Sequence, residues 1–108
     1  MAERAPELEG MIARYREELA RRGVRVERVY LFGSYKDGTQ REGSDVDLLV
    51  ISRDFEGLGL WERLGILGAA AGLILEPIEA AGFTPREVEE GDIPSFWKQV
   101  LEDEAVLV

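Results

Sequence analysis

The 108-residue chain has the composition of an ordinary folded protein, with 45% hydrophobic and 32% charged residues. This length supports one modest hydrophobic core, so we expect a single domain over residues 1–108. The formal net charge of −9 argues against binding of long nucleic acid, because phosphate contacts need a basic patch.

The chain contains no cysteine and no histidine. Disulfides, Cys/His zinc sites, thiol nucleophiles and histidine-based acid–base catalysis are therefore excluded. Any catalysis must use carboxylates, hydroxyls, amines and a metal ion. No secretory signal opens the sequence and the longest apolar stretch, residues 66–75, is too short to cross a bilayer, so we expect a cytoplasmic protein.

The first half of the chain is predicted to form a helix, a strand, a helical turn, a polar loop or hairpin connection and a second strand: residues 8–19, 28–32, 34–37, 39–44 and 45–51. Apolar residues at helical spacing define the first helix, and Gly23 is its expected stop. The two strands are expected to run antiparallel.

The second half is predicted to form a helix, a strand, a capped helix, a last helix and a short tail strand: residues 59–71, 73–80, 84 onward, 94–101 and 106–108. Pro77 within the strand implies an edge position or a bulge. Thr84 and Glu87 make a capping box with Pro85 at the first helical position. The order of elements predicts an α/β (α+β) domain with a small mixed sheet and flanking helices.

The helix over residues 59–71 has an apolar face that includes Trp61, and we expect Trp61 and Trp97 to lie in the core. Gly65 and Gly68 inside this helix each lower its stability by about 1 kcal/mol relative to alanine. They indicate either close packing on a neighbour or a helix held mainly by tertiary contacts.

Asp45 and Asp47 open the second strand and, because side chains alternate, they point to the same face. Two like charges at the head of an apolar strand repel each other and resist desolvation. A shared divalent cation relieves both effects, and Mg²⁺ is usually held by one or two carboxylates together with substrate phosphates.

Gly33 and Ser34 follow the first strand and form a turn with free backbone N–H groups and a hydroxyl. A glycine lets the backbone approach a phosphate closely, and the start of a helical turn favours an anion. The alternative is an ordinary tight turn with a helix cap. Together with the two aspartates, the pattern indicates nucleotide handling at a metal ion.

Gly33-Ser34, ten intervening residues and then Asp45-x-Asp47 resemble the signature of the DNA polymerase β-type nucleotidyltransferase superfamily. Their strand contexts are similar to those of its small branch, the minimal nucleotidyltransferases, which include the antitoxins of HEPN/MNT toxin–antitoxin pairs. The resemblance implies a nucleotidyltransferase catalytic core, with Asp45 and Asp47 as catalytic metal ligands, Mg²⁺ or Mn²⁺ as the metal and ATP as substrate.

The resemblance also implies a third acid on a later strand, usually an aspartate. The candidates here are Glu76 and Glu79. Glu79 fits the usual distance to the Thr84 helix start better, so the resemblance implies that Glu79 is the third catalytic residue and metal ligand. A glutamate in this place departs from the family pattern. So does Asp37, where many relatives have a basic residue before the glycine.

Lys36, Arg41 and Arg53 are candidates for contacts with the triphosphate, although exposed basic residues in polar loops are usually only solvated. Tyr35, beside Ser34, is a further candidate for a nucleotide or partner contact.

Three functions stay open from the sequence. The first is transfer of AMP from ATP to a hydroxyl of a partner protein, with a HEPN ribonuclease toxin as the partner. The second is a catalytically silent antitoxin that neutralises its toxin by contact. The third is a nucleotidyltransferase for a small molecule such as an aminoglycoside, acting as a dimer.

Overall fold

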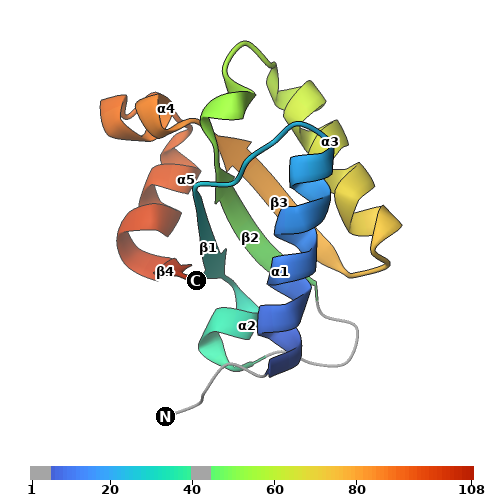
Figure 1. Ribbon diagram of the computed structural model, residues 1–108. Helices are drawn as coiled ribbons and strands as arrows, with labels where there is room; N and C mark the ends of the chain where they lie inside the picture. Colours follow the sequence, from blue (N-terminus) through green and yellow to red (C-terminus); the bar gives the residue numbers. More distant parts are fainter. Residues whose placement is uncertain (1–5, 40–44) are drawn as a thin grey trace.

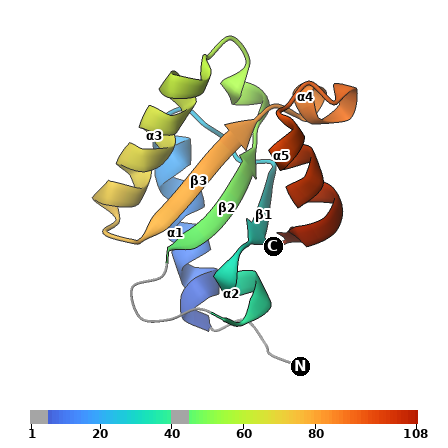
Figure 2. The ribbon, with the colours of Figure 1, turned by 180° about the vertical axis from the view of Figure 1, so that it is seen from behind.

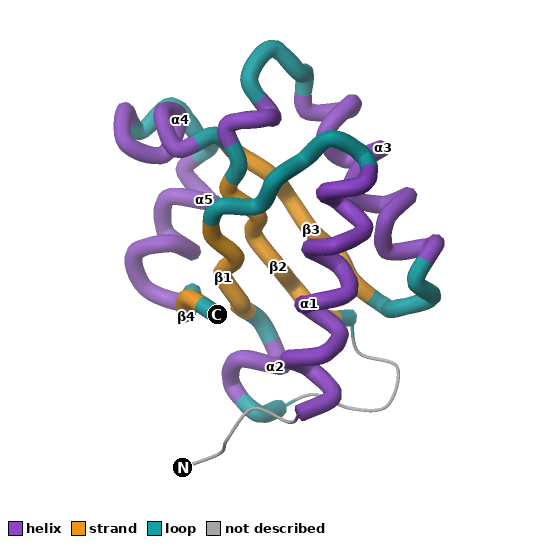
Figure 3. The backbone as a smooth tube through the Cα atoms, in the orientation of Figure 1, coloured by secondary structure: helices purple, strands orange, loops and turns teal. Residues whose placement is uncertain are grey.

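The computed structural model describes residues 6–39 and 45–108. Within these ranges one mixed sheet has the strand order β3-β2-β1-β4 (Figures 1 and 3), and its strands are Arg28–Phe32 (β1), Val46–Ile51 (β2), Ile78–Phe83 (β3) and Val106–Leu107 (β4). β1 runs antiparallel to β2 and to β4, whereas β2 and β3 are parallel. The predicted α/β fold and the antiparallel pairing of the first two strands are confirmed.

The helices are Pro6–Arg21 (α1), Ser34–Asp37 (α2), Leu60–Leu73 (α3), Pro85–Glu90 (α4) and Ser95–Gln99 (α5), with a 3-10 turn at Arg53–Phe55 and a π turn at Val100–Glu104. Figures 1 and 2 show α1 and α3 on one face of the sheet and α5 on the other. No helix in the described part of the chain has the length and apolar character needed to cross a membrane.

Alternation along β2 builds two cores. Val46, Leu48 and Val50 are buried with α1 and α3, while Leu49 and Ile51 are buried in a second cluster that includes Trp97 of α5. Because β2 is covered on both faces, it reads as an almost continuous apolar run. The aspartates at its start are the exception to this pattern.

The third strand begins later in the chain than residues 73–80, the range that the sequence predicts. Leu73 ends α3 and the strand begins only at Ile78, because backbone N–H groups of Leu75 and Glu76 bond back to Gly72 and Ala71 at 3.1 and 3.2 Å. These bonds form a helix-ending turn in which Leu75 takes the left-handed conformation, with φ of 58°. Pro77 therefore lies before the strand and not within it, and of the two expected alternatives, an edge position or a bulge, β3 has the edge position.

The prediction that Trp61 is a core residue is wrong, since 86% of its surface is exposed. The buried side of α3 is instead formed by Arg63, Leu67 and two alanines. Trp97 is half-buried in the second cluster, and its ring lies edge-on to Phe32 with 5.4 Å between centroids. Its predicted place in the core is confirmed.

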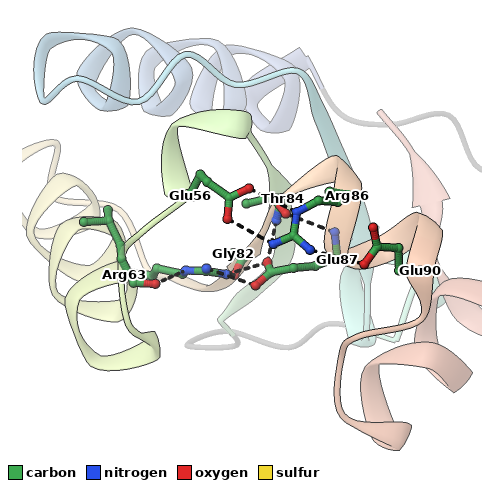
Figure 4. Close-up of polar contacts among 8 residues, drawn as sticks. Glu56, Arg63, Gly82, Thr84, Arg86, Glu87 and Glu90 are labelled. Carbon is green, nitrogen blue, oxygen red and sulfur yellow. Dashed lines mark hydrogen bonds and ion pairs between the residues drawn. The ribbon is translucent and has the colours of Figure 1, made fainter.

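An ion pair between a buried arginine and a half-buried glutamate joins α3 to α4 near the carboxyl end of β3 (Figure 4). The Arg63 guanidinium donates two hydrogen bonds to the Glu87 carboxylate, at 2.7 and 3.1 Å, and further ones to the carbonyl oxygens of Leu58 and Gly82. Glu87 also accepts a bond of 2.8 Å from the backbone N–H of Thr84, as the predicted capping box requires. This end of the sheet is therefore fixed by fully bonded charges.

Candidate active site

The turn after β1 is built on Gly33. Its φ of 74° and ψ of −155° lie in a region that favours glycine, and Ser34 follows as the first residue of α2. The backbone N–H groups of Lys36 and Asp37 donate to the Gly33 carbonyl at 3.1 and 3.2 Å, and α2 ends at Gly38 in the left-handed conformation. The predicted helical turn between the two strands is confirmed.

Asp47 lies against this turn because β1 and β2 are antiparallel. Phe32, the last residue of β1, is the register partner of Asp47. A Cβ atom added to Gly33 would clash with the carboxylate of Asp47, so only glycine leaves room for that side chain. Asp45, exposed, immediately precedes the strand. The structure thus brings Gly33, Ser34 and the two aspartates to one end of the sheet.

The parallel pairing of β2 with β3 distinguishes the two candidate third acids. Glu79 is the register partner of Asp47, and both belong to the face that Leu49 continues toward α5. Glu76 lies before the strand and forms an ion pair with Arg14 of α1. The register therefore places Glu79, rather than Glu76, beside Asp47.

The pKa of Asp47 is raised above its ordinary value, first by burial and second by the negative charge of Asp45. Within residues 6–39 and 45–108, no group of three acidic side chains lies close enough together to hold one metal ion. The oxygen donors and the repulsion between Asp45 and Asp47 fit a hard divalent cation, and Glu79 is a further acid in register with Asp47.

The candidate basic residues are placed very differently. Lys36 lies on α2 and is paired with Asp37 at 3.1 Å. Arg41 lies outside the described residues. Arg53 follows the opposite end of β2 and pairs with Glu27 at 3.2 Å, so it is far from the aspartates and the suggestion that it contacts the triphosphate is wrong. Tyr35 is half-buried against the core cluster under α1.

A surface hollow of about 240 Å³ also lies at that opposite end, lined by Arg25, Glu27, Arg53 and Asp54. Its charges are already used within the chain, because Arg53 pairs with Glu27 and Asp54 accepts the Arg25 backbone N–H at 2.8 Å. This hollow therefore does not mark the candidate active site, which is identified from Asp45 and Asp47.

Phe32 was not singled out from the sequence, although its place beside Asp47 makes it part of the site's surroundings. It packs with Ala81 and Trp97 on the face that carries Asp47 and Glu79. The signal was available: a strand that ends at Gly33 and pairs antiparallel must place its last residue opposite the start of the next strand.

The geometry is that of a strand, a glycine turn and a second strand that begins with two carboxylates on one face. The model of the nucleotidyltransferase domain family matches residues 12–107. The chain belongs to this family, and the predicted resemblance to minimal nucleotidyltransferases is confirmed.

Among curated proteins, the chain is similar to the protein adenylyltransferase MntA of Shewanella oneidensis, with 42% identity over 43 residues. The matched part covers 39% of this chain but only 31% of the length of that protein.

Solved structures share the fold. A toxin–antitoxin crystal structure with AMP-PNP aligns at a TM-score of 0.61 and 21% identity, covering 92% of this chain and 70% of that one. A putative nucleotidyltransferase from Sulfolobus solfataricus aligns at 0.55 and 19% identity, covering 99% and 89%. A mutant of the MntA–HpeT toxin–antitoxin aligns at 0.58 and 17% identity, covering 92% and 69%.

Proposed function

We propose that this protein transfers AMP from ATP to a hydroxyl group of a partner protein. The observation that carries the proposal is the carboxylate of Asp47 seated over Gly33, with Asp45 two residues before it and Glu79 beside it in register. Membership of the nucleotidyltransferase domain family supports the type of reaction.

Asp45, Asp47 and Glu79 would hold a divalent cation, Mg²⁺ or Mn²⁺, which when bound neutralises phosphate charge and lowers the pKa of the attacking hydroxyl. The backbone at Gly33 and the hydroxyl of Ser34 would bind phosphate oxygens. Lys36 and Arg41 remain the candidate basic contacts to the triphosphate.

In the proposed transfer, the acceptor oxygen forms a bond to the α-phosphorus while the bond from that phosphorus to the β-phosphate oxygen breaks. Pyrophosphate leaves, and the acceptor's proton passes to the Glu79 carboxylate. The chain's main contribution is to position groups and neutralise charge, as in other phosphoryl transfers.

The partner we propose is a HEPN-type toxin. The support is indirect: the similar MntA is named as a protein adenylyltransferase, and two structural neighbours are toxin–antitoxin complexes. The net charge of −9 favours a basic partner. The acceptor we propose is a tyrosine hydroxyl of that partner.

A second candidate is a catalytically silent antitoxin that acts by contact. Three observations favour it: the third acid is a glutamate, Lys36 is paired with Asp37, and no three acids converge within the described residues. Such a protein would still bind its toxin through the same fold.

Incubation with the cognate HEPN protein, ATP and Mg²⁺ distinguishes the two. We expect intact-mass spectrometry to show steps of about 329 Da on the HEPN protein, one for each AMP transferred. Asp45→Asn should abolish the steps, and Asp92→Asn, an exposed aspartate outside the site, should not. An unmodified mass with full neutralisation by both wild type and Asp45→Asn would refute transfer and support the silent module.

A further inference from the structure

An apolar surface hollow lies beside the carboxyl half of β3, between the start of α3 and α5 (Figure 2). Its volume is about 180 Å³, and its apolar walls are formed by Leu60, Leu64, Ala81, Phe83, Pro94 and Trp97. Leu60 and Leu64 are 55% and 44% exposed although they are large and apolar, so the hollow is open to solvent. We call this feature the β3 hollow.

The size of the β3 hollow limits what it can bind. Pockets for drug-sized molecules and cofactors usually measure roughly 300–1,000 Å³, whereas a cavity of roughly 150 Å³ accommodates a benzene molecule. At about 180 Å³, the β3 hollow has room for one large apolar side chain. The size therefore favours a side chain that belongs to another protein over a free small molecule.

The charges around the hollow indicate what surrounds that side chain. Arg63 also lines the hollow, but its guanidinium is already bonded to the Glu87 carboxylate and the Gly82 carbonyl (Figure 4). The segment over residues 76–95, which includes β3 and α4, has a single basic residue, Arg86, and these acids: Glu76, Glu79, Glu87, Glu89, Glu90 and Asp92. Acidic surroundings favour an occupant whose apolar side chain is flanked by lysine or arginine.

The strand β3 connects the hollow to the candidate active site. Ala81 follows Glu79 by two residues, and because side chains alternate along a strand, both belong to the face that carries Asp47. Two residues of a strand span about 7 Å. An apolar side chain held beside Ala81 therefore brings the neighbouring groups of its own protein within reach of the Glu79 carboxylate.

Trp97 makes a second connection between the hollow and the site. Its ring packs edge-on against Phe32, Phe83 and Phe96, with centroid separations of 5.4, 6.1 and 4.9 Å. Edge-to-face contact is a favoured arrangement of aromatic rings, so Trp97 forms a well-defined wall of the hollow. Phe32, on the other side of that wall, is the register partner of Asp47.

We propose that the β3 hollow binds an apolar side chain of the acceptor protein, flanked by basic residues, and thereby positions the acceptor hydroxyl at Glu79. This inference rests on the proposed transfer of AMP to a partner protein. Because the wall residues take no part in the bond changes, the hollow contributes to the binding of the acceptor and not to the chemical step.

Leu64→Gln tests the proposal against Leu73→Gln, which places the same side chain on the same helix at a leucine that does not line the hollow. AMP transfer is measured at varied concentrations of the cognate HEPN protein and of ATP. We expect Leu64→Gln to raise the KM for the HEPN protein about tenfold, with kcat and the KM for ATP changed by less than about twofold. Leu73→Gln should match wild type in all three constants. Leu60→Gln changes a second wall residue and should give the same shift as Leu64→Gln, so the test does not depend on the folding of one variant.

Equal KM values for the HEPN protein in Leu64→Gln and Leu73→Gln would overturn the proposal while leaving the proposed transfer intact. A raised KM for ATP would overturn it as well and assign the hollow to the nucleotide. A wild type that transfers no AMP would instead refute the proposed function, and calorimetric titration of the HEPN protein without ATP then decides about the hollow. Weaker binding by Leu64→Gln but not by Leu73→Gln would support it as the docking site, whereas equal binding by the two variants, or no binding by wild type, would overturn it.

Discussion

The two ends of the sheet carry acidic side chains in opposite electrostatic settings. At the start of β2, Asp47 has a raised pKa because it is partly buried and lies near Asp45. Near the carboxyl end of β3, burial alone would raise the pKa of Glu87, but hydrogen bonds from Arg63 and Thr84 outweigh it and hold the pKa below the ordinary value. In the folded chain the ionised form of Asp47 is disfavoured, whereas the ionised form of Glu87 is stabilised.

The difference separates a structural charge from a candidate functional one. The Arg63–Glu87 pair satisfies itself within the chain and ties together α3, β3 and α4. Asp45 and Asp47 instead keep a repulsion that a bound cation would remove. A carboxylate with a perturbed pKa, such as that of Asp47, is characteristic of a functional site, where a ligand completes its environment.

The largest expected effect is that of Asp47→Asn on transfer. Loss of a charge that holds the cation removes several kcal/mol of transition-state stabilisation, so the rate of AMP transfer should fall by about 100-fold or more. In the metal-free protein the same change should raise the melting temperature at pH 7, because it removes an unfavourable ionised group.

This gain in stability should depend on pH. It is fully present when Asp47 is ionised and should disappear as pH falls through its raised pKa toward 3.8, the ordinary value. Thermal unfolding from pH 7 to 3.5 measures it, with Asp92→Asn as the control. If Asp47→Asn is no more stable than wild type at pH 7, the proposed contrast between the raised pKa of Asp47 and the lowered pKa of Glu87 is contradicted.

Glu87→Gln should have the next largest effect, on stability. It leaves the Arg63 guanidinium buried without its counter-charge, and breaking such a pair lowers the free energy of unfolding by about 3–5 kcal/mol. Glu89→Gln, an exposed change on the same helix, should lower it by less than about 0.5 kcal/mol. Urea unfolding at pH 7 compares the two variants, and similar losses would show that the pair contributes little.

The effect of Glu87→Gln on stability depends on pH in the opposite sense to that of Asp47→Asn. The pKa of Glu87 is lowered from its ordinary 4.5, so its stabilising contribution is present above pH 4.5 and is lost as pH falls through the depressed value. Wild type and Glu87→Gln should therefore converge in stability only under more acidic conditions. Convergence already near pH 6 would be inconsistent with the lowered pKa.

The smallest of the three effects on stability is expected for Gly33→Ala. A side chain in a left-handed conformation lowers the free energy of unfolding by about 1–2 kcal/mol. Gly38→Ala is a matched control, because Gly38 has a φ of 75° but open space where its Cβ would lie. Gly38→Ala should lose about this much, whereas Gly33→Ala should lose more, because Gly33 lies outside the αL region and its Cβ would displace the Asp47 carboxylate. Only Gly33→Ala should reduce AMP transfer. Equal transfer by the two would show that this contact is unimportant.

The strands and the turn that carry Gly33-Ser34 and Asp45-x-Asp47 could be predicted from the sequence because their signals are local. The apolar run before Gly33, the turn to Gly38 and the run after Asp47 each announce a strand or a turn by composition, and the structure has them there. The capping box at Thr84 was equally readable. Spacing along one short segment was sufficient to predict which residues gather at the end of β1 and β2.

The features that were mispredicted depend on tertiary context. The end of α3 is set by Leu75 in a conformation normally reserved for glycine, which propensity cannot reveal. The apolar helical face that includes Trp61 predicts a core position for it, whereas a buried arginine, Arg63, occupies the inner side of the helix. That arginine is stable there only because Glu87, far along the chain, supplies its counter-charge.

The parallel pairing of β2 with β3 also bears on the order in which the candidate site is assembled during folding. Asp45 and Asp47 can meet the Gly33 turn through a short antiparallel connection, but Glu79 joins them only after α3 has been made and β3 has docked on β2. Such non-local pairing is slower than local pairing because a long loop must close first. A growing chain can therefore bring Asp45 and Asp47 to the Gly33 turn before Glu79 reaches them, and the candidate site is completed only when the fold is nearly complete.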